Sequence, residues 1–108
     1  MKTLKFKGFK AQWILENKKT ATMRLFDDKK LSAGDELELI NSDNNDIFAY
    51  AKIFEVIEKK LRELTESDFK GHERWRNNEE MYEGFRKYYG DRVTPDTIVK
   101  IIRFATHD

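Results

Sequence analysis

Short runs in which apolar and polar side chains alternate recur along this chain, and this two-residue period constrains the fold more than any other feature. In the run 20–25, for example, Met23 and Leu25 fall on one side while Thr22 and Arg24 fall on the other. A β-strand turns successive side chains to opposite faces, so such runs predict strands. The predicted strands are a short opening strand at Leu4 and Phe6, followed by 20–25, 36–40, 47–57 and 97–105.

Two segments have helical spacing instead. Residues 9–16 place apolar side chains four positions apart, and Asn17 after them tolerates the left-handed backbone that ends a helix. Residues 77–90 form the second helical pattern, with Asn77 as a plausible N-cap and Gly90 as a C-terminal stop. The chain is therefore predicted to have two helices, one after the first strand and one before the last.

The order of predicted elements is β-α-β-β-β-α-β, with 37–57 as a hairpin across a polar turn at 41–46. Strands outnumber helices, which indicates a mainly β fold of the α+β class: a small β-barrel with two main helices. With 108 residues, the chain is expected to form a single domain, 1–108, around one modest core. The side chains expected in that core are Phe9, Trp13, Ile14, Met23, Leu39, Ile53, Phe85, Ile101 and Phe104.

The residue types present exclude several classes of site. There is no cysteine, so disulfides, thiol nucleophiles and thiolate-bound metals are ruled out. The two histidines, His72 and His107, do not lie in a metal-binding spacing, and we expect no metal and no cofactor. Residues 1–9 lack the long apolar core of a signal peptide, and no run approaches the length of a membrane span. A cytoplasmic protein without a membrane partner is expected.

Charge is unevenly distributed, although the net charge is only +1. Residues 1–30 carry nine basic and three acidic side chains, whereas residues 31–108 carry twelve basic and seventeen acidic ones. The resulting balance of +6 against −5 indicates a side of the molecule that faces phosphate groups. Small lysine-rich proteins also reach such an asymmetry by chance, so both interpretations stay open.

The junction between the first helix and the next strand gathers the groups most suited to binding. Lys18 and Lys19 lie at the junction itself, and the side chains of Thr20, Thr22 and Arg24 follow on one face of the strand. Ammonium, hydroxyl and guanidinium groups this close together suit a phosphate, a carbonyl or the edge of a base. The alternative is that they are ordinary residues on a solvated strand face.

The loop before the second helix holds the other candidates. Glu73 is a carboxylate in the kind of segment that often carries function, and close to Lys19 it would exchange a proton with it. Pairing of Glu73 with a neighbouring arginine at the surface is the alternative. We interpret His72 as a solvent-facing turn residue rather than a general base. Trp75 is a candidate for stacking on a base, with packing as the alternative, whereas Trp13 is assigned to the core.

Taken together, these segments resemble the ASCH family, whose members carry a glycine-lysine-lysine-threonine-x-threonine-x-arginine motif after a short first helix. Here the motif stands as Asn17-Lys18-Lys19-Thr20-Ala21-Thr22-Met23-Arg24, with an asparagine that tolerates the same left-handed backbone as the glycine. The other similar segments are Lys30 with Gly34 and Asp35, residues 64–69 with 71–73, residues 88–90 and residues 98–104. The resemblance therefore spans nearly the whole chain.

The resemblance implies a PUA-like β-barrel whose cleft is lined by the lysine-threonine motif and takes RNA or a nucleoside. One bacterial branch with a similar motif hydrolyses the amide of acetylcytidine with a lysine, a threonine and a glutamate. Carried over by position, these catalytic roles fall on Lys19, Thr22 and Glu73, in a metal-independent amide hydrolase. The candidates for ligand binding are Lys18, Thr20, Arg24 and Trp75.

Whether the chain turns over a ligand stays open from the sequence. Three functions are compatible with the sequence. The first is an enzyme acting on a modified nucleoside, the second is a non-catalytic RNA-binding module of PUA-like type, and the third, less favoured, is a protein-interaction domain. The acidic stretch 63–83 works against the extended basic stripe that long RNA needs. We expect a monomer in which one concave site brings together Lys19, Thr22, Arg24 and Glu73.

Overall fold

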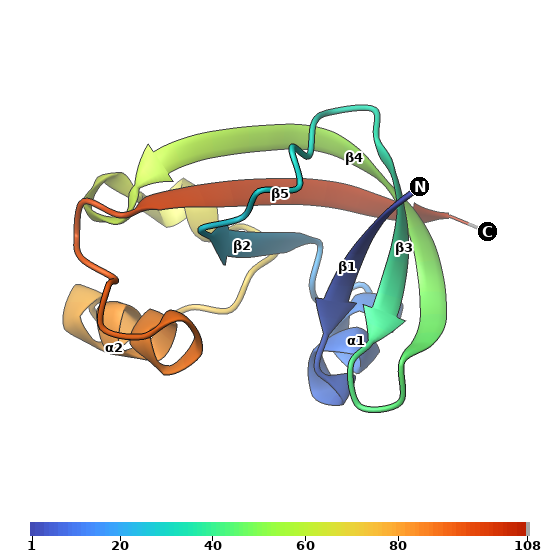
Figure 1. Cartoon of the computed structure of the whole chain (residues 1–108), viewed down its shortest axis with the longest axis horizontal. Coiled ribbons are helices and arrows are strands. Elements are labelled where there is room, and N and C mark those ends of the chain that lie inside the picture. Colours follow the sequence, from blue (N-terminus) through green and yellow to red (C-terminus); the bar gives the residue numbers. More distant parts are fainter. Residues whose placement is uncertain (108) are drawn as a thin grey trace.

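The computed structural model describes residues 1–107 and contains strands and α-helices in the predicted order (Figure 1). These are β1 (Lys2–Phe6), α1 (Gly8–Leu15), β2 (Ala21–Leu25), β3 (Glu36–Asn41), β4 (Asp46–Lys60), α2 (Asn78–Tyr89) and β5 (Ile98–His107). Two short 3-10 helices, η1 (Leu61–Glu63) and η2 (Glu66–Phe69), lie between β4 and α2 and are additional to the prediction. The β-α-β-β-β-α-β order and the α+β class are confirmed.

The strands form one five-stranded curled sheet in the order β1-β3-β4-β5-β2. β1 pairs with β3 in parallel, whereas the β3–β4, β4–β5 and β5–β2 pairs are antiparallel. The predicted hairpin is the β3–β4 pair. The sheet curls so that its first and last strands turn toward each other, which makes it a half-barrel with α1 and α2 below its two ends (Figure 1).

β4 and β5 run through both halves of the molecule. β4 has 15 residues, and its register against β5 shifts between Ile53 and Glu55. The residue between them, Phe54, is 60% exposed. An irregularity of this kind bends a strand and increases its twist, which lets one long strand serve both ends of a curled sheet.

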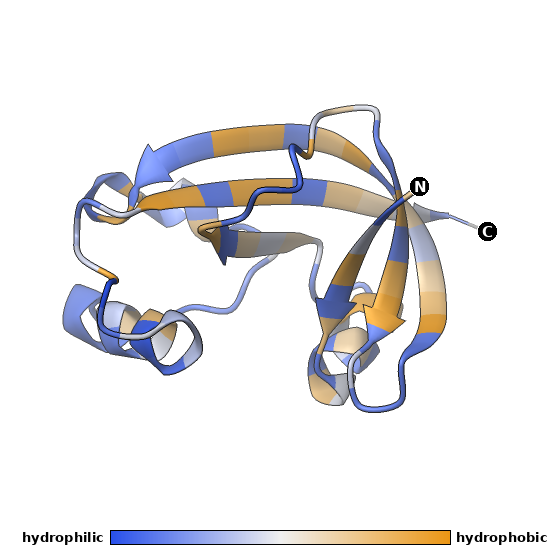
Figure 2. Ribbon diagram, in the orientation of Figure 1, coloured by the Kyte–Doolittle hydropathy of each residue, from blue (hydrophilic) through white to orange (hydrophobic). Residues whose placement is uncertain are grey.

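Two hydrophobic clusters lie against this sheet. The first joins α1, β1, β3 and part of β4, and its members include Leu4, Ile14, Leu37 and Ile53. The second joins α2 to β2 and η1, and includes Met23, Leu61, Met81 and Phe85. β5 contributes to both, because consecutive residues of a strand face opposite sides: Ile102 lies in the first cluster and Ile101 in the second. Hydrophobic and hydrophilic residues accordingly alternate in blocks along β4 and β5 (Figure 2).

The two edge strands, β1 and β2, are connected by side chains. Arg24 of β2 donates from Nη2 to the carbonyl oxygen of Lys5 in β1 at 2.9 Å. Lys29, which follows β2, donates from Nζ to the carbonyl oxygen of Thr3 at 2.7 Å. The Arg24 guanidinium also lies 4.9 Å from the ring centre of Phe6, a cation–π distance. Long cationic side chains therefore span the gap between the sheet edges.

Most of the predicted core is confirmed. The predicted side chains that are buried are Ile14, Met23, Leu39, Ile53, Phe85, Ile101 and Phe104. The prediction is wrong for Phe9, which is 52% exposed, and Trp13 is half-buried. α1 turns Ala11 and Ile14 toward the core, so Phe9 and Trp13 occupy an adjoining face. There the two rings pack edge to face against each other, with their centres 5.2 Å apart.

Candidate functional site

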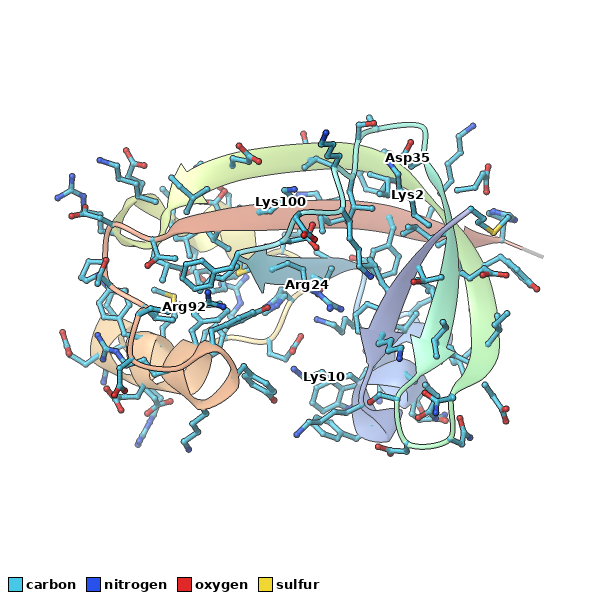
Figure 3. The ribbon with its side chains drawn as sticks, in the orientation of Figure 1. Lys2, Lys10, Arg24, Asp35, Arg92 and Lys100 are labelled. Atoms are coloured by element: carbon cyan, nitrogen blue, oxygen red, sulfur yellow. The ribbon has the colours of Figure 1, made fainter. Side chains whose placement is uncertain are left out.

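A cavity of about 190 Å³ lies where β1, α1, β2, the loop before α2 and α2 come together. Lys10 reaches toward this region from α1, and Arg24 enters it from β2 (Figure 3). Lys19 and Thr22 are buried polar residues of this cavity, 3% and 4% exposed, and the buried side chain of His72 also lines it. Glu73 joins them from the loop. The cavity therefore has a polar floor whose groups come from opposite halves of the chain.

The end of α1 sets the position of Lys19. Asn17 has a φ of 61°, the left-handed conformation predicted for it, and this turns the chain back on the helix. The amides of Lys18 and Lys19 then donate to the carbonyl oxygen of Trp13 at 2.8 and 3.2 Å. The Lys19 side chain points inward and is 3% exposed, whereas that of Lys18 is 71% exposed and lies 3.6 Å from Glu16.

Gly71 sets the position of the loop that carries Glu73. Its carbonyl oxygen accepts hydrogen bonds from the amides of Thr20 and Ala21 at 2.9 and 3.2 Å. Gly71 has a φ of +76°, and a Cβ at this position would collide with the hydroxyl oxygen of Thr20. Both the backbone conformation and the available space therefore require glycine. Because this contact ties the loop to the start of β2, Glu73 lies beside Lys19.

Lys19 and Glu73 form the central ion pair of the cavity. Nζ of Lys19 donates to Oε2 of Glu73 at 2.6 Å, and Nζ of Lys10 lies 3.5 Å from Oε1. Burial lowers the pKa of Lys19 to about 8, although the Glu73 carboxylate raises it. Burial opposes ionisation of Glu73, but His72, which is protonated at the low pH where Glu73 titrates, and the Lys19 ammonium outweigh it and lower the pKa of Glu73 to about 2. Glu73 is therefore a carboxylate at neutral pH, and Lys19 loses its proton unusually easily.

Thr22 and Arg24 lie two residues apart on β2 and so share a face of the strand. Oγ1 of Thr22 accepts a hydrogen bond from Nε of Arg24 at 3.0 Å. A hydroxyl that accepts at its oxygen still has its own proton to donate. A cationic donor also stabilises negative charge on that oxygen, which favours loss of the hydroxyl proton. The Thr22 hydroxyl therefore keeps a proton to donate beside a cationic group.

Aromatic side chains from the loop and α2 line another part of the cavity. Trp75 packs against Phe85 with ring centres 5.0 Å apart, and both belong to the second hydrophobic cluster or contact it. Tyr88 is 56% exposed, and the ammonium nitrogens of Lys7 and Lys10 lie 5.3 and 5.1 Å from its ring centre. Flat apolar walls beside a polar floor suit a nucleobase, which has an apolar face and a polar edge.

Solved structures share this arrangement of strands and helices. The ASCH domain from Lactobacillus crispatus JV V101 superposes with a TM-score of 0.74 at 14% identity, over 97% of this chain and 79% of that one. A hypothetical protein, PH0355, gives a TM-score of 0.76 at 18% identity, over 99% and 100%. A point mutant of ZmASCH from Zymomonas mobilis gives 0.71 at 12% identity, over 98% and 68%. The chain has the ASCH-domain fold. The resemblance implies a small β-barrel with two main helices; the sheet is a curled half-barrel with two α-helices, and the α+β fold of ASCH domains is confirmed.

Identities this low establish the ASCH fold and not the ligand. Neither a scan against models of known protein families nor a search of curated proteins found a match. The activity of this ASCH-fold chain is therefore inferred from its own cavity.

The ASCH fold brings the predicted catalytic residues together. Lys19, Thr22, Arg24 and Glu73 all line the cavity, as expected, although Lys19 and Glu73 are 54 positions apart in the sequence. Trp75 lines the cavity as well and also packs against the second hydrophobic cluster, so stacking on a ligand and packing in the core are compatible there.

Two predicted ligand-binding residues lie outside the cavity, and one interpretation of the loop is wrong. Lys18 and Thr20 are exposed and do not line the cavity, because Thr20 precedes β2 and its hydroxyl packs beside Gly71. His72 is not solvent-facing: its side chain is 7% exposed, and Nδ1 lies 2.8 Å from the carbonyl oxygen of Glu73. Burial lowers the pKa of His72 to about 4, so its ring is neutral at neutral pH.

The lysines near the start of the chain are site residues that the sequence analysis does not single out. Lys5, Lys7 and Lys10 all line the cavity, and Lys5 and Lys7 are exposed at its mouth. The available signal is their spacing: Lys5 and Lys7 flank Phe6 at alternating positions, and Lys10 follows Lys7 by three residues, close to one helical turn.

Groups of three or more His, Cys, Asp or Glu side chains that could hold a metal ion are absent from residues 1–107. No helix in this described part of the chain is long and apolar enough to cross a membrane. The groups that the cavity offers for chemistry are the amine of Lys19, the carboxylate of Glu73 and the hydroxyl of Thr22.

Proposed function

We propose that this chain binds a pyrimidine nucleoside and hydrolyses an acyl amide on its exocyclic amino group, as in acetylcytidine. The observation that carries the proposal is the ion pair between the buried Lys19 and Glu73 in a cavity that Thr22 also lines. Hydrolysis of an amide needs a nucleophile, a base and an acid for the leaving group. Thr22 supplies the nucleophile, Lys19 acts first as the base and then as the acid, and Glu73 holds Lys19 in place. The resemblance of residues 17–24 to the motif of the acetylcytidine-hydrolysing branch of the ASCH family supports the same class of substrate.

In the first step the neutral amine of Lys19 takes the proton of the Thr22 hydroxyl, and the Thr22 oxygen forms a bond to the acyl carbonyl carbon. Glu73 accepts a hydrogen bond from the Lys19 amine, which leaves the nitrogen lone pair available to Thr22. Arg24 donates to the Thr22 oxygen and stabilises its developing charge. A pKa of about 8 leaves roughly a tenth of Lys19 neutral at pH 7.

The carbon–nitrogen bond then breaks. Lys19 returns the proton to the departing exocyclic nitrogen, and the acyl group remains on Thr22 as an ester. In the second step Lys19 takes a proton from a water molecule, and the hydroxide attacks the ester carbon. The ester bond breaks, Thr22 regains its proton from Lys19, and the acid leaves and loses its proton to solvent. One water is consumed, and the products are the free amine and a carboxylate.

Acetate release from acetylcytidine tests this proposal. Thr22→Val removes the nucleophile, Lys19→Met removes the base, and Glu73→Gln removes the charge that holds Lys19. Each variant should lose about a hundredfold or more in kcat, the scale of a general-base or nucleophile contribution. Thr22→Ser retains a hydroxyl and should retain part of the activity.

The matched control is Lys18→Met, which makes the same change one position away from Lys19 on a side chain outside the cavity. It should behave as the unsubstituted chain does. Circular dichroism of every variant checks that the fold is retained. Undiminished turnover by a folded Thr22→Val variant would rule out the threonine nucleophile, and acetate release absent from the unsubstituted chain would rule out the hydrolase.

The alternative function is a non-catalytic RNA-binding module using the same cavity. The exposed lysines at the mouth, Lys5 and Lys7, favour it. The salt dependence of the affinity distinguishes the two functions. Binding of a neutral nucleoside releases few counterions, so its affinity should change little with salt. The affinity for an RNA bound through several phosphates should fall by about an order of magnitude or more over a few-fold rise in salt. Tight, salt-sensitive binding of a short RNA without acetate release would support the module.

A further inference from the structure

The cavity is far more basic than the chain as a whole. Five of its lining side chains are cationic, namely Lys5, Lys7, Lys10, Lys19 and Arg24, whereas Glu73 is the single acidic side chain among the lining residues described. The net charge of the whole chain is only +1. All five cations lie within residues 1–30, the basic segment of the sequence. An uncharged nucleoside leaves most of this positive charge without a counterpart, which points to an anionic ligand.

The cationic side chains differ in how deeply they lie in the cavity. Lys19 is 3% exposed and is engaged with Glu73 on the floor, and Arg24 is held by Thr22 and by the backbone of β1. Lys5 and Lys7 are exposed at the mouth, and neither forms an ion pair with any residue in the described range 1–107. Lys5 and Lys7 can therefore bind an anion without breaking an ion pair or a hydrogen bond with any residue that the structure describes, and they lie at the mouth, away from the groups proposed for chemistry.

The mouth gathers these lysines around one aromatic ring. Nζ of Lys7 and Nζ of Lys10 lie 5.3 and 5.1 Å from the ring centre of Tyr88, so both ammonium groups lie around the same ring. Their like charges favour the binding of an anion at this part of the mouth. The N-terminus of α1 is not the anion site, because Oδ2 of Asp43 already accepts from the amide of Gly8 there at 3.1 Å.

We infer that the ligand of this cavity is a nucleoside monophosphate, with its base on the Lys19 floor and its phosphate among Lys5, Lys7 and Lys10. The assignment of the base rests on the proposed function, whereas the phosphate rests on the unpaired charge at the mouth. A single phosphate matches a mouth with three ammonium groups, one of which Glu73 shares. The adjoining segment 63–83 carries seven acidic and three basic side chains, which does not favour a longer strand.

Equilibrium binding of non-acylated ligands tests this inference without relying on catalysis. The probes are cytidine, cytidine 5′-monophosphate, cytidine 3′-monophosphate and inorganic phosphate. At least one monophosphate should bind about tenfold or more tightly than cytidine, as expected for a new charge-assisted hydrogen bond. Comparison of the 5′ and 3′ compounds identifies the phosphate position. Inorganic phosphate should bind more weakly than the preferred nucleotide, because it makes no contact with the floor.

Charge-removing variants locate the phosphate. Lys5→Gln and Lys7→Gln should each reduce the preference for the monophosphate over cytidine, by about tenfold where the lysine contacts the phosphate directly. The matched control is Lys52→Gln, an equal charge change at an exposed position of β4 outside the cavity. It should leave the preference unchanged. Equal affinity for cytidine and both monophosphates, or a preference that neither Lys5→Gln nor Lys7→Gln alters, would overturn the inference.

The same measurements separate this inference from the proposed hydrolase. Tight monophosphate binding with no acetate release from acetylated nucleoside or nucleotide would refute the hydrolase and support the phosphate site. Efficient hydrolysis of acetylcytidine, with no gain in kcat/KM for its monophosphates, would support the hydrolase and overturn the phosphate site. A short RNA that binds much more tightly than any monophosphate, with the steep salt dependence of several phosphate contacts, would also overturn it.

Discussion

Lys19 holds its proton more weakly than an ordinary lysine because its ammonium group has lost most of its contact with water. Its side chain is 3% exposed, and the cost of burying the charge outweighs the attraction of Glu73. Lys10 and Arg24 lower the pKa of Lys19 further, so that it reaches about 8. Glu73 therefore has two effects: it holds the amine in place, and it keeps the pKa from falling lower still.

The pH dependence of hydrolysis follows from this balance. Lys19 acts as a base only after losing its proton, so kcat/KM should rise about tenfold per pH unit below a pKa of about 8 and level off above it. Glu73→Gln removes the charge that raises the pKa of Lys19, so NMR titration of the Lys19 side chain should show its pKa shifted downward. A rate independent of pH from 6 to 9, about the range around that pKa, would contradict the role of Lys19 as base.

Individual reactive residues can be found from the sequence, but their exposure cannot. Lys18 and Lys19 are identical side chains at consecutive positions, and the backbone after the left-handed turn at Asn17 buries Lys19 and leaves Lys18 exposed. The sequence around His72 predicts a solvent-facing turn residue. In the structure its ring packs against those of Phe69 and Trp75, with ring centres 6.4 and 6.1 Å apart. Such contacts depend on the loop conformation, which local sequence does not specify.

The loop–strand contact at Gly71 is the element on which the candidate site depends. Gly71→Ala should destabilise the fold by about 2–4 kcal/mol, since it adds a collision with Thr20 to the strain of a positive φ. Gly34→Ala is the matched control, because Gly34 also has a positive φ, +95°, but open space around its Cβ position. It should cost only about 1 kcal/mol. Urea denaturation measures both free energies of unfolding.

A second substitution distinguishes collision from backbone strain. Thr20→Ala removes the hydroxyl oxygen that the new methyl group would meet, so in the Gly71→Ala background it should recover part of the lost stability. Strictly additive effects of the two substitutions would show that the collision contributes nothing.

Elements with strong local signals are predicted best. α2 begins where its cap predicts, because the side chain of Asn77 accepts from the amide of Glu80 at 2.8 Å, and it ends at Gly90, which has a φ of +86°. The parallel pairing of β1 with β3 is different, since it joins residues about 35 positions apart, such as Lys2 and Leu37. No alternation or cap within either strand encodes that partner, and it follows from burial of both strands against α1.

The whole molecule has two hydrophobic clusters on one sheet, and β4 and β5 belong to both. Ile101 and Ile102 are each fully buried, on opposite sides of β5. Ile101→Ala and Ile102→Ala should therefore each lower the free energy of unfolding by about 2–5 kcal/mol. Because the same strands support both clusters, each variant should unfold in one cooperative transition.

The two tryptophans allow unfolding to be followed separately in the two halves of the molecule, the half with α1 and the half with α2. Trp13 lies on α1, the helix that contributes Ile14 to the first cluster, and Trp75 packs against the second. In Trp13→Phe and Trp75→Phe chains, fluorescence reports one half at a time, and the two unfolding curves should coincide for the otherwise unsubstituted chain and for Ile101→Ala. A separation of the two midpoints would show that the halves unfold independently.

The contacts between the sheet edges also bear on how copies of this chain behave at high concentration. The free edge of a sheet exposes backbone carbonyl groups to which a strand of another molecule can bind, and such pairing begins aggregation. In β1, alternate carbonyl groups, those of Thr3 and Lys5, already accept hydrogen bonds from Lys29 and Arg24. An approaching strand would have to displace two cationic side chains and would leave their charges beside its own backbone. The same arginine that supports the Thr22 oxygen thus protects the chain from polymerising through β1.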